Sequence, residues 1–213
     1  MSKVRVNGFS ISADGYGAGP EQSLEHPLGK GASFHNWLTS SRYFKTMTGQ
    51  DGGNEGVDNG FAERSMAGLG AWVMGRNMFG PVRGPWPDGE WKGWWGDNPP
   101  YHCPVYVLTH HARAPLEMDG GTVFHFVTEG PDKALELARA AAGEQDIRIG
   151  GGVSTVRHYL KAGAIDTMHV AIAPTLMGKG EALFEGIDLP ALGYRVTEHA
   201  PGEQALHMVL ARG

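Results

Sequence analysis

The strongest candidate for ligand binding is a run of three glycines between a predicted strand and a predicted helix. Gly150, Gly151 and Gly152 follow the apolar stretch 146–149 and precede a helical pattern over 153–162. In such a turn, bare backbone N–H groups and the positive end of the helix face outward together, which suits a phosphate group. The spacing is not that of the G-x-G-x-x-G dinucleotide fingerprint. A tight turn without a ligand is therefore the alternative interpretation.

Two further turns carry polar side chains directly after apolar runs. Gly75, Arg76 and Asn77 follow one run, and Thr109 and His110 end the next. Arginine offers a planar fork to phosphate oxygens, although each turn alone is also compatible with a surface ion pair or a solvated loop. The carboxyl ends of parallel strands meet at one edge of a sheet, where open α/β folds bind nucleotides. Taken together, the three turns predict a nucleotide site.

The elements that must position these turns alternate along the chain. Predicted strands span 3–11, 71–74, 104–109, 122–127, 146–149 and 166–173, with an antiparallel pair at 193–199 and 205–211. Predicted helices span 33–47, 58–67 with Asp58 as N-cap, 132–142 with Pro131 at its first position, and 153–162. This alternation predicts an α/β fold with a largely parallel sheet. We expect a single domain over 1–213, with a Gly-rich insertion or lid at about 19–60.

Composition excludes several classes of protein. The chain has 213 residues, 33 glycines, one cysteine and a formal net charge of −5. A single cysteine rules out an internal disulfide framework and paired-cysteine zinc sites. The negative charge argues against nucleic-acid binding, and no apolar run is long enough to span a membrane. No histidine spacing typical of a metal site occurs, so we predict no metal. We also predict that the protein is cytoplasmic.

A series of motifs occurs in an order that matches a known family. They span 12–16, 34–37, 70–79, 107–110, 126–130, 150–152, 160–166 and 174–184. In these segments the sequence resembles the dihydrofolate-reductase-like family that includes the reductase domain of riboflavin biosynthesis. It is most similar to the single-domain bacterial branch of that family. The resemblance implies a mostly parallel central sheet, antiparallel C-terminal strands, helices on both faces, NADPH as hydride donor and a homodimer.

The resemblance also implies which residues contact NADPH. Carried over to this sequence, the cofactor residues are Gly15, Gly17 and Ala18 at the nicotinamide, Gly75, Arg76 and Asn77 at the phosphates, Thr109 and His110 at the ribose 2′-phosphate, Thr128 at the adenosine, and Gly151, Gly152, Val153 and Ser154 at the pyrophosphate.

The sequence departs from relatives of known activity at three places. Thr167 stands where the family often has glutamate, and Ser40 and Ser41 precede the segment where folate reductases place a carboxylate. Cys103 has no partner cysteine, so the zinc-dependent deaminase half of the riboflavin enzymes is absent. We therefore expect a reductase of a small heterocycle with C=N or C=O. The alternatives are reduction of dihydrofolate or of the ribosylamino-pyrimidine of riboflavin synthesis, and a non-catalytic nucleotide- or flavin-binding protein.

Hydride transfer to a heterocycle benefits from a nearby proton donor. Asp14 follows the first strand and His35 lies on the predicted lid, so both are candidate catalytic residues, and Trp37 is a candidate substrate contact. An Asx-turn for Asp14 and a structural role for His35 are the alternatives. A loop with Trp86, Trp91, Trp94 and Trp95 forms either an aromatic wall for a planar substrate, a subunit contact, or a loop packed on itself.

Overall fold

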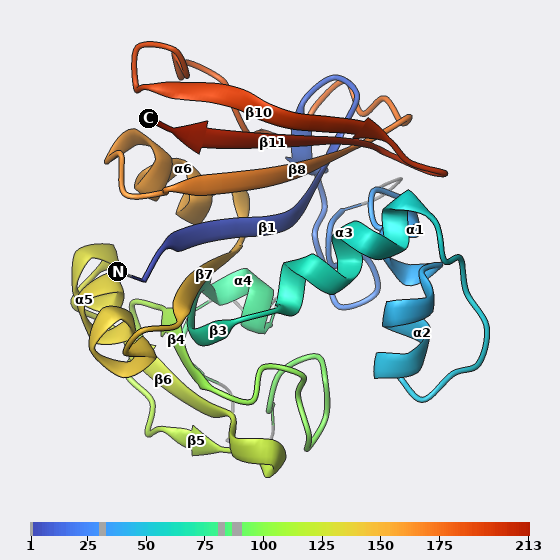
Figure 1. Cartoon of the computed structure of the whole chain (residues 1–213). Coiled ribbons are helices and arrows are strands. Elements are labelled where there is room, and N and C mark those ends of the chain that lie inside the picture. The colour runs from blue at the N-terminus through green and yellow to red at the C-terminus, as the bar shows by residue number, and fades with distance from the viewer. Residues whose placement is uncertain (1, 30–32, 81–83, 87–90) are drawn as a thin grey trace.

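A nine-stranded sheet of order β10-β11-β8-β1-β7-β3-β4-β6-β5 runs through the described part of the chain (Figure 1). The computed structural model describes all residues except 1, 30–32, 81–83 and 87–90. The strands are β1 (Val4–Ser12), β2 (Tyr16–Ala18), β3 (Leu69–Gly75), β4 (Pro104–Leu108), β5 (Leu116–Glu117), β6 (Val123–Val127), β7 (Asp146–Gly151), β8 (Thr167–Ala173), β9 (Glu181–Ala182), β10 (Tyr194–Pro201) and β11 (Leu206–Arg212). The helices are α1 (Asn36–Thr39), α2 (Arg42–Met47), α3 (Val57–Met66), α4 (Arg76–Phe79), α5 (Pro131–Ala142) and α6 (Val153–Lys161).

The centre of the sheet is parallel and its margins are antiparallel. Strands β8, β1, β7, β3, β4 and β6 pair in parallel, whereas β11 runs antiparallel to β8, β10 to β11, and β5 to β6. The short strands β2 and β9 form a separate antiparallel pair. The predicted α/β class with antiparallel C-terminal strands is therefore confirmed.

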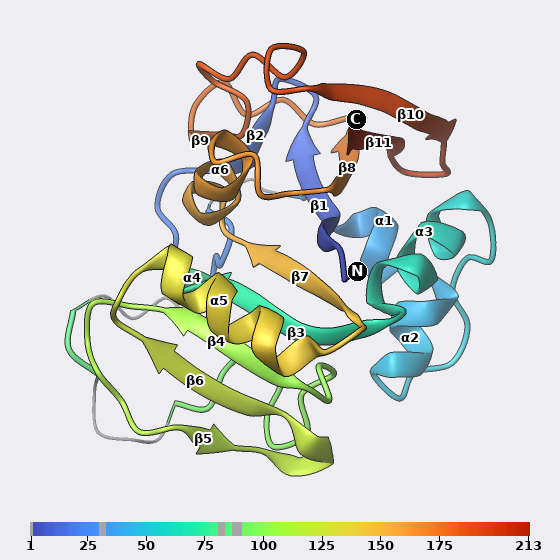
Figure 2. The same ribbon diagram turned by 60° about the vertical axis from the view of Figure 1, so that its left-hand side comes forward.

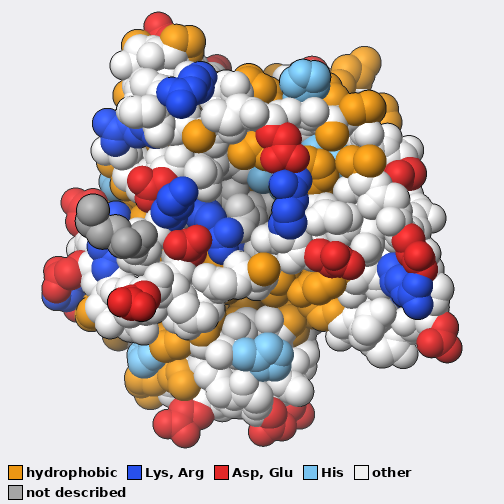
Figure 3. All heavy atoms as spheres, viewed as in Figure 1, with side chains coloured by type: hydrophobic (Ala, Val, Ile, Leu, Met, Phe, Trp, Pro, Cys, Tyr) orange, Lys and Arg blue, Asp and Glu red, His pale blue; other side chains and the backbone are white. Residues whose placement is uncertain are grey.

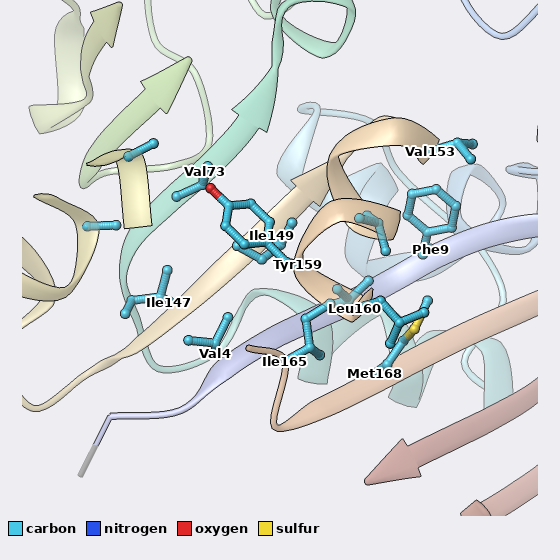
Figure 4. Packing of buried hydrophobic residues seen from close by; sticks show 14 of the residues in the cluster. Val4, Phe9, Val73, Ile147, Ile149, Val153, Tyr159, Leu160, Ile165 and Met168 are labelled. Carbon is cyan, nitrogen blue, oxygen red and sulfur yellow. The ribbon is translucent and has the colours of Figure 1, made fainter. Parts of the chain in front are cut away.

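Alternating side chains build a core on each face of the sheet. On β3, Ala71 and Val73 pack with α5 and α6, and the intervening Trp72 faces the other way, into a second cluster. Figure 2 shows α5 and α6 in front of the sheet, and Figure 4 shows Ile149, Tyr159 and neighbouring residues filling the space between. Helices α1 and α3 cover part of the opposite face through a third cluster. Both faces are thus covered by helices, as expected.

The segment 19–60 differs from its prediction. The expected helix over 33–47 is divided into α1 and α2, because Ser41 leaves the helical conformation and its hydroxyl caps α2 by accepting a hydrogen bond from the Phe44 N–H (3.2 Å). Helix α3 begins at Val57 with Gly56 as N-cap, so the prediction that Asp58 caps this helix is wrong. Asp58 lies inside the first turn and is fully buried.

The surface view of Figure 3 shows acidic and basic side chains interspersed over this face of the molecule, with hydrophobic atoms between them. This face therefore presents no extended area of a single charge sign.

None of the helices in the described ranges combines the length and apolar character needed to cross a membrane.

Candidate functional site

A cleft of about 1210 Å³ brings together strand β2 and the Gly-rich and polar turns that follow β3, β4, β6 and β7. Its wall includes most residues singled out in the sequence, namely Gly17, Ala18, His35, Gly75, Arg76, Asn77, Thr109, His110, Thr128, Gly151, Gly152, Val153 and Ser154. Asp14, Gly15 and Trp37 are not part of the wall. Turns widely separated in the sequence thus meet at one edge of the sheet, as the parallel topology requires.

The turn between β7 and α6 is open toward the cleft. Gly152 is the N-cap of α6, with no side-chain cap and no acidic residue in the first turn. A Cβ atom at Gly152 would meet nothing within 4 Å, so the backbone is bare on that side. At Gly17 the situation is reversed, because a Cβ there would lie 2.7 Å from Val153 Cγ2. Glycine at Gly17 therefore permits the close approach of the β2 strand to the start of α6.

Arg76 and Thr109 form a polar cluster at the outer part of the cleft. The Arg76 Nη1 donates to Thr109 Oγ1 at 3.0 Å, and the guanidinium lies 3.2 Å from the centroid of the Trp86 ring. The exposed His110 follows directly, and the Thr128 hydroxyl donates to Glu129. Stacking on an indole holds a guanidinium flat and directs its edge, an arrangement suited to binding a phosphate group.

The start of the 19–60 segment borders the same end of the cleft. Asn77 Nδ2 donates to Gln22 Oε1 (3.1 Å), and Gln22 Nε2 donates to Glu181 Oε1 (2.7 Å). Helices α1 and α2, in the second half of the segment, pack against α3 and also line the cleft through Leu38, Tyr43 and Phe44. Both halves of the segment therefore contribute to the cleft wall, and its movement as a lid stays a prediction.

Asp14 serves as an anchor for a neighbouring loop. Its carboxylate accepts hydrogen bonds from the Ser12 hydroxyl (2.6 Å) and from the backbone N–H groups of Met177 (3.0 Å) and Gly178 (2.7 Å). These donors lower the pKa of Asp14 to about 2, so the group is ionised at neutral pH. The position of Asp14 outside the cleft wall and its ionised state both argue against the predicted role as proton donor. The adjacent Gly15 contributes its carbonyl to a hydrogen bond from Leu183 N–H.

Trp37 is a core residue, which corrects the prediction that it contacts substrate. Its ring is 1% exposed, and its Nε1 donates to Ser10 Oγ at 2.8 Å. The ring also packs edge-on against His169 and His207. Trp37 lies two residues after His35, and residues two apart in a helical turn lie on roughly opposite sides. Trp37 therefore points away from the cleft, whereas His35 lines it.

His35 lies in the inner part of the cleft beside side chains that the sequence analysis missed. Burial and the nearby charge of Arg148 lower the pKa of His35 to about 4, so its imidazole is neutral at neutral pH. Its Nδ1 is buried and has no hydrogen-bond partner. The surrounding wall includes Tyr43, Trp72, Tyr101 and Arg148. One signal in the sequence was available, because Arg148 interrupts an otherwise apolar strand between two isoleucines.

The Trp-rich loop is divided between the core and the cleft wall, and its predicted contact with a planar substrate or with another subunit stays a prediction. Trp86 and Trp91 donate their indole N–H groups to the carbonyls of His111 and Phe79, and pack on the sheet. Trp94 and Trp95 line the cleft, and the Trp95 ring centroid lies 6.1 Å from that of Phe44 on α2. The parts of the loop at 81–83 and 87–90 lie outside the described residues.

In the part of the chain that the structure describes, no three His, Cys, Asp or Glu side chains are grouped closely enough to hold a metal ion. The prediction that the protein has no intrinsic metal remains a prediction, which a metal analysis of the purified protein tests.

Comparison with known proteins places the chain in a family. The family model described as "RibD C-terminal domain" matches residues 3–207. This protein belongs to the RibD C-terminal domain family. The predicted membership is thereby confirmed. No curated protein gives a significant match.

Solved structures share the fold of this RibD C-terminal domain protein. A putative riboflavin biosynthesis protein from Shewanella sp. PV-4 matches with 23% identity and a TM-score of 0.58, covering 100% of this chain and 99% of that one. A pyrimidine reductase-like protein from Corynebacterium diphtheriae matches with 15% identity and a TM-score of 0.53, covering 99% and 91%. A Thermotoga maritima diaminohydroxyphosphoribosylaminopyrimidine deaminase/5-amino-6-(5-phosphoribosylamino)uracil reductase matches with 11% identity and a TM-score of 0.51, covering 100% of this chain and 57% of that one. The expected dihydrofolate-reductase-like fold class is therefore confirmed.

Proposed function

We propose that this protein is an NADPH-dependent reductase that transfers a hydride to the C=N or C=O group of a small heterocyclic substrate. Membership of the RibD C-terminal domain family supports the reductase class. The observation that carries the proposal is the single cleft that joins the turns suited to phosphate binding to an inner compartment lined by aromatic side chains. A dinucleotide and a planar ring fit end to end in such a cleft.

The residues at the outer end fit NADPH. The bare backbone at Gly152 and the N-terminus of α6 offer N–H donors to a pyrophosphate, since neither a side-chain cap nor an acidic residue occupies that position. Arg76 and Thr109, already hydrogen-bonded to each other, offer a cation and a hydroxyl to a ribose phosphate. NADPH when bound would supply the hydride.

The inner residues orient the substrate and exclude water. Phe44, Trp94 and Trp95 line the cleft from two elements, α2 and the Trp-rich loop. Burial raises the pKa of Tyr101 to about 12 and also raises that of Tyr43, so both phenols keep their protons at neutral pH. These O–H groups, rather than the ionised Asp14, are available to hold a substrate heteroatom by a hydrogen bond. The neutral His35 can act in the same way through its ring N–H.

A more specific candidate is reduction of a ribosylamino-pyrimidine of riboflavin synthesis. It is supported by the likeness to the Thermotoga maritima protein, which is described as a reductase of such a pyrimidine, and to the Corynebacterium diphtheriae protein, which is described as pyrimidine reductase-like. Dihydrofolate is a weaker candidate, because Ser40 and Ser41 supply no carboxylate for a pterin. A binding protein without turnover is the remaining alternative.

We also propose, from the family resemblance, that the protein is cytoplasmic and forms a homodimer. Analytical ultracentrifugation of the purified chain tests whether it is a dimer.

Titration with NADPH and NADH, followed by quenching of tryptophan fluorescence, tests the cofactor assignment. We expect NADPH to bind more tightly than NADH, and Arg76→Met to weaken NADPH binding by about tenfold or more with little effect on NADH. Arg139→Met, on the outer side of α5, is a matched control that should change neither affinity. Equal affinities for the two cofactors in the wild-type protein would contradict the phosphate site, and absence of binding would favour another ligand.

A further inference from the structure

Arg148 is a buried cation in the wall of the inner compartment. It projects from β7 with 8% of its surface exposed, on the side of the sheet opposite its neighbours Ile147 and Ile149. The guanidinium stacks 4.2 Å from the centroid of the Trp72 ring. Its Nη1 donates to Ser65 O (2.9 Å), and its Nη2 donates to Asn7 O (2.7 Å). These carbonyls fix the position of the guanidinium but leave its charge uncompensated.

No acidic group balances this charge among the residues that the structure describes. None of the ion pairs found there includes Arg148. Burial lowers the pKa of Arg148 to about 10, with a further contribution from the like charge of Arg5, and the acidic groups that face it, the phenols of Tyr101 and Tyr43, are protonated at neutral pH. The side chain therefore remains a cation at neutral pH. Buried charges in proteins are ordinarily paired, so an unpaired cation in a cleft wall points to an anionic ligand.

Other polar atoms nearby also have no partner. The indole Nε1 of Trp72, the Nδ1 of His35 and the Nε of Arg148 are all buried without a hydrogen bond. These side chains all contribute to the same cleft, whose wall also includes the aromatic residues Tyr43 and Tyr101 and the apolar residues Leu38, Met47 and Met66. Such orphan polar atoms are rare in folded proteins and mark positions where a ligand atom completes the hydrogen bonding. The cleft wall thus combines aromatic and apolar side chains with unpaired polar atoms.

We propose that the compartment around Arg148 binds a negatively charged group carried by a planar heteroaromatic substrate, so that the substrate is an acid rather than a neutral ring. The guanidinium would face the anion, and the rings of Trp72 and Tyr101 would lie along the heteroaromatic plane. This inference rests on the proposed function only in so far as the ligand is called a substrate. The binding of an aromatic acid at this place does not require NADPH.

A purely structural role for Arg148 makes a different prediction. Its hydrogen bonds to Asn7 and Ser65 connect the irregular part of β1 to the end of α3, and that role concerns folding alone. It gives the cleft no preference between a charged and an uncharged ligand of the same shape. A matched pair of ligands therefore separates the two roles.

The experiment compares quinoline-2-carboxylate with quinoline-2-carboxamide, which differ mainly in charge, by calorimetric titration of the cofactor-free protein at pH 7.5. We expect the carboxylate to bind about tenfold or more tightly than the amide, since a hydrogen bond to a charged partner contributes that much. The preference should disappear in Arg148→Met and survive in part in Arg148→Lys, which keeps the charge. Arg64→Met, which removes a surface arginine paired with Glu198, should retain the full preference.

Three results would overturn the inference. They are equal binding of acid and amide to the wild-type protein, no binding of either at about 1 mM, and a preference for the acid that persists in Arg148→Met. If Arg148→Met does not fold, the wild-type preference and its partial retention in Arg148→Lys still decide the matter. Failure of NADPH to bind while the acid preference is observed would refute the proposed function and leave the anion site standing.

Discussion

Acidification should destabilise the protein through a buried chain of hydrogen bonds that begins at Gly8, a residue of the cleft wall. Gly8 N–H donates to His169 Nδ1 (3.1 Å), His169 Nε2 lies 3.0 Å from His207 Nδ1, and His207 Nε2 lies 2.7 Å from Asp58 Oδ1. Because the backbone N–H of Gly8 can only donate, the Nδ1 of His169 must accept, the ring proton lies on Nε2, and the imidazole of His169 is neutral. The chain spans three elements, β1, β8 and β11, and ends at α3.

Protonation of His169 would break this order, because its Nδ1 would then have to donate toward the N–H of Gly8. Burial is the main cause that lowers the pKa of His169 from 6.5 to about 3, and nearby positive charge acts in the same direction. The unfolded chain takes up this proton below about pH 6.5 and the folded chain does not, so stability falls as the pH decreases through that window. Between pH 7 and pH 5 the expected loss is about 2 kcal/mol.

Urea unfolding at pH 7 and pH 5 measures the effect in the wild type and in His169→Asn. The asparagine oxygen can still accept from Gly8 N–H, but the titrating group is gone. We expect the variant to be less stable at pH 7 yet to lose about 2 kcal/mol less than the wild type on going to pH 5. His35, whose pKa is also lowered, contributes equally to both proteins and cancels in this comparison.

The control is His199→Asn, which replaces an exposed histidine on β10 and should leave the pH dependence of the wild type intact. If the wild type and His169→Asn lose the same stability between pH 7 and pH 5, the reasoning about a neutral, buried imidazole chain is refuted.

Three substitutions test the packing around the cleft. Trp37→Phe loses the hydrogen bond to Ser10 and should lower the unfolding free energy by about 1 to 2 kcal/mol without changing NADPH affinity, measured by urea unfolding and fluorescence titration; weaker NADPH binding would show that the ring reaches the cleft after all. Gly152→Ala should lower the unfolding free energy by about 1 kcal/mol, since alanine is a poorer N-cap than glycine although its Cβ meets no atom, and should weaken NADPH binding several-fold; unchanged affinity would remove this turn from the site. Gly17→Ala should destabilise by about 1 to 3 kcal/mol through its clash with Val153, and a normal melting temperature would contradict that packing.

The turns of the cleft could be predicted because each is a local feature. A strand that runs into Gly150-Gly151-Gly152 and then into an amphipathic helix encodes its own geometry within a dozen neighbouring residues. Parallel pairing then brings the carboxyl ends of such units to one edge, so Arg76 and Thr109, 33 residues apart, meet without further information. Helix ends were less secure, as Asp58 shows, because a short polar side chain suits both an N-cap and a buried partner.

Apart from His35, the buried polar groups of the inner compartment and of the His169–His207–Asp58 chain could not be predicted, because their partners are distant in sequence. Asp58 and His207 are 149 positions apart, and Arg148 lies 141 positions from the carbonyl of Asn7 that it binds. Periodicity places Trp37 on a helix but does not say which side of that helix is covered, and the packing of α1 decided that it faces the core. The sequence by itself determined the strands, the order of the turns and the edge where they meet, since backbone preference and side-chain alternation act over a few residues. Only the tertiary structure decided which polar side chains are buried without a partner, since that depends on how separate elements pack.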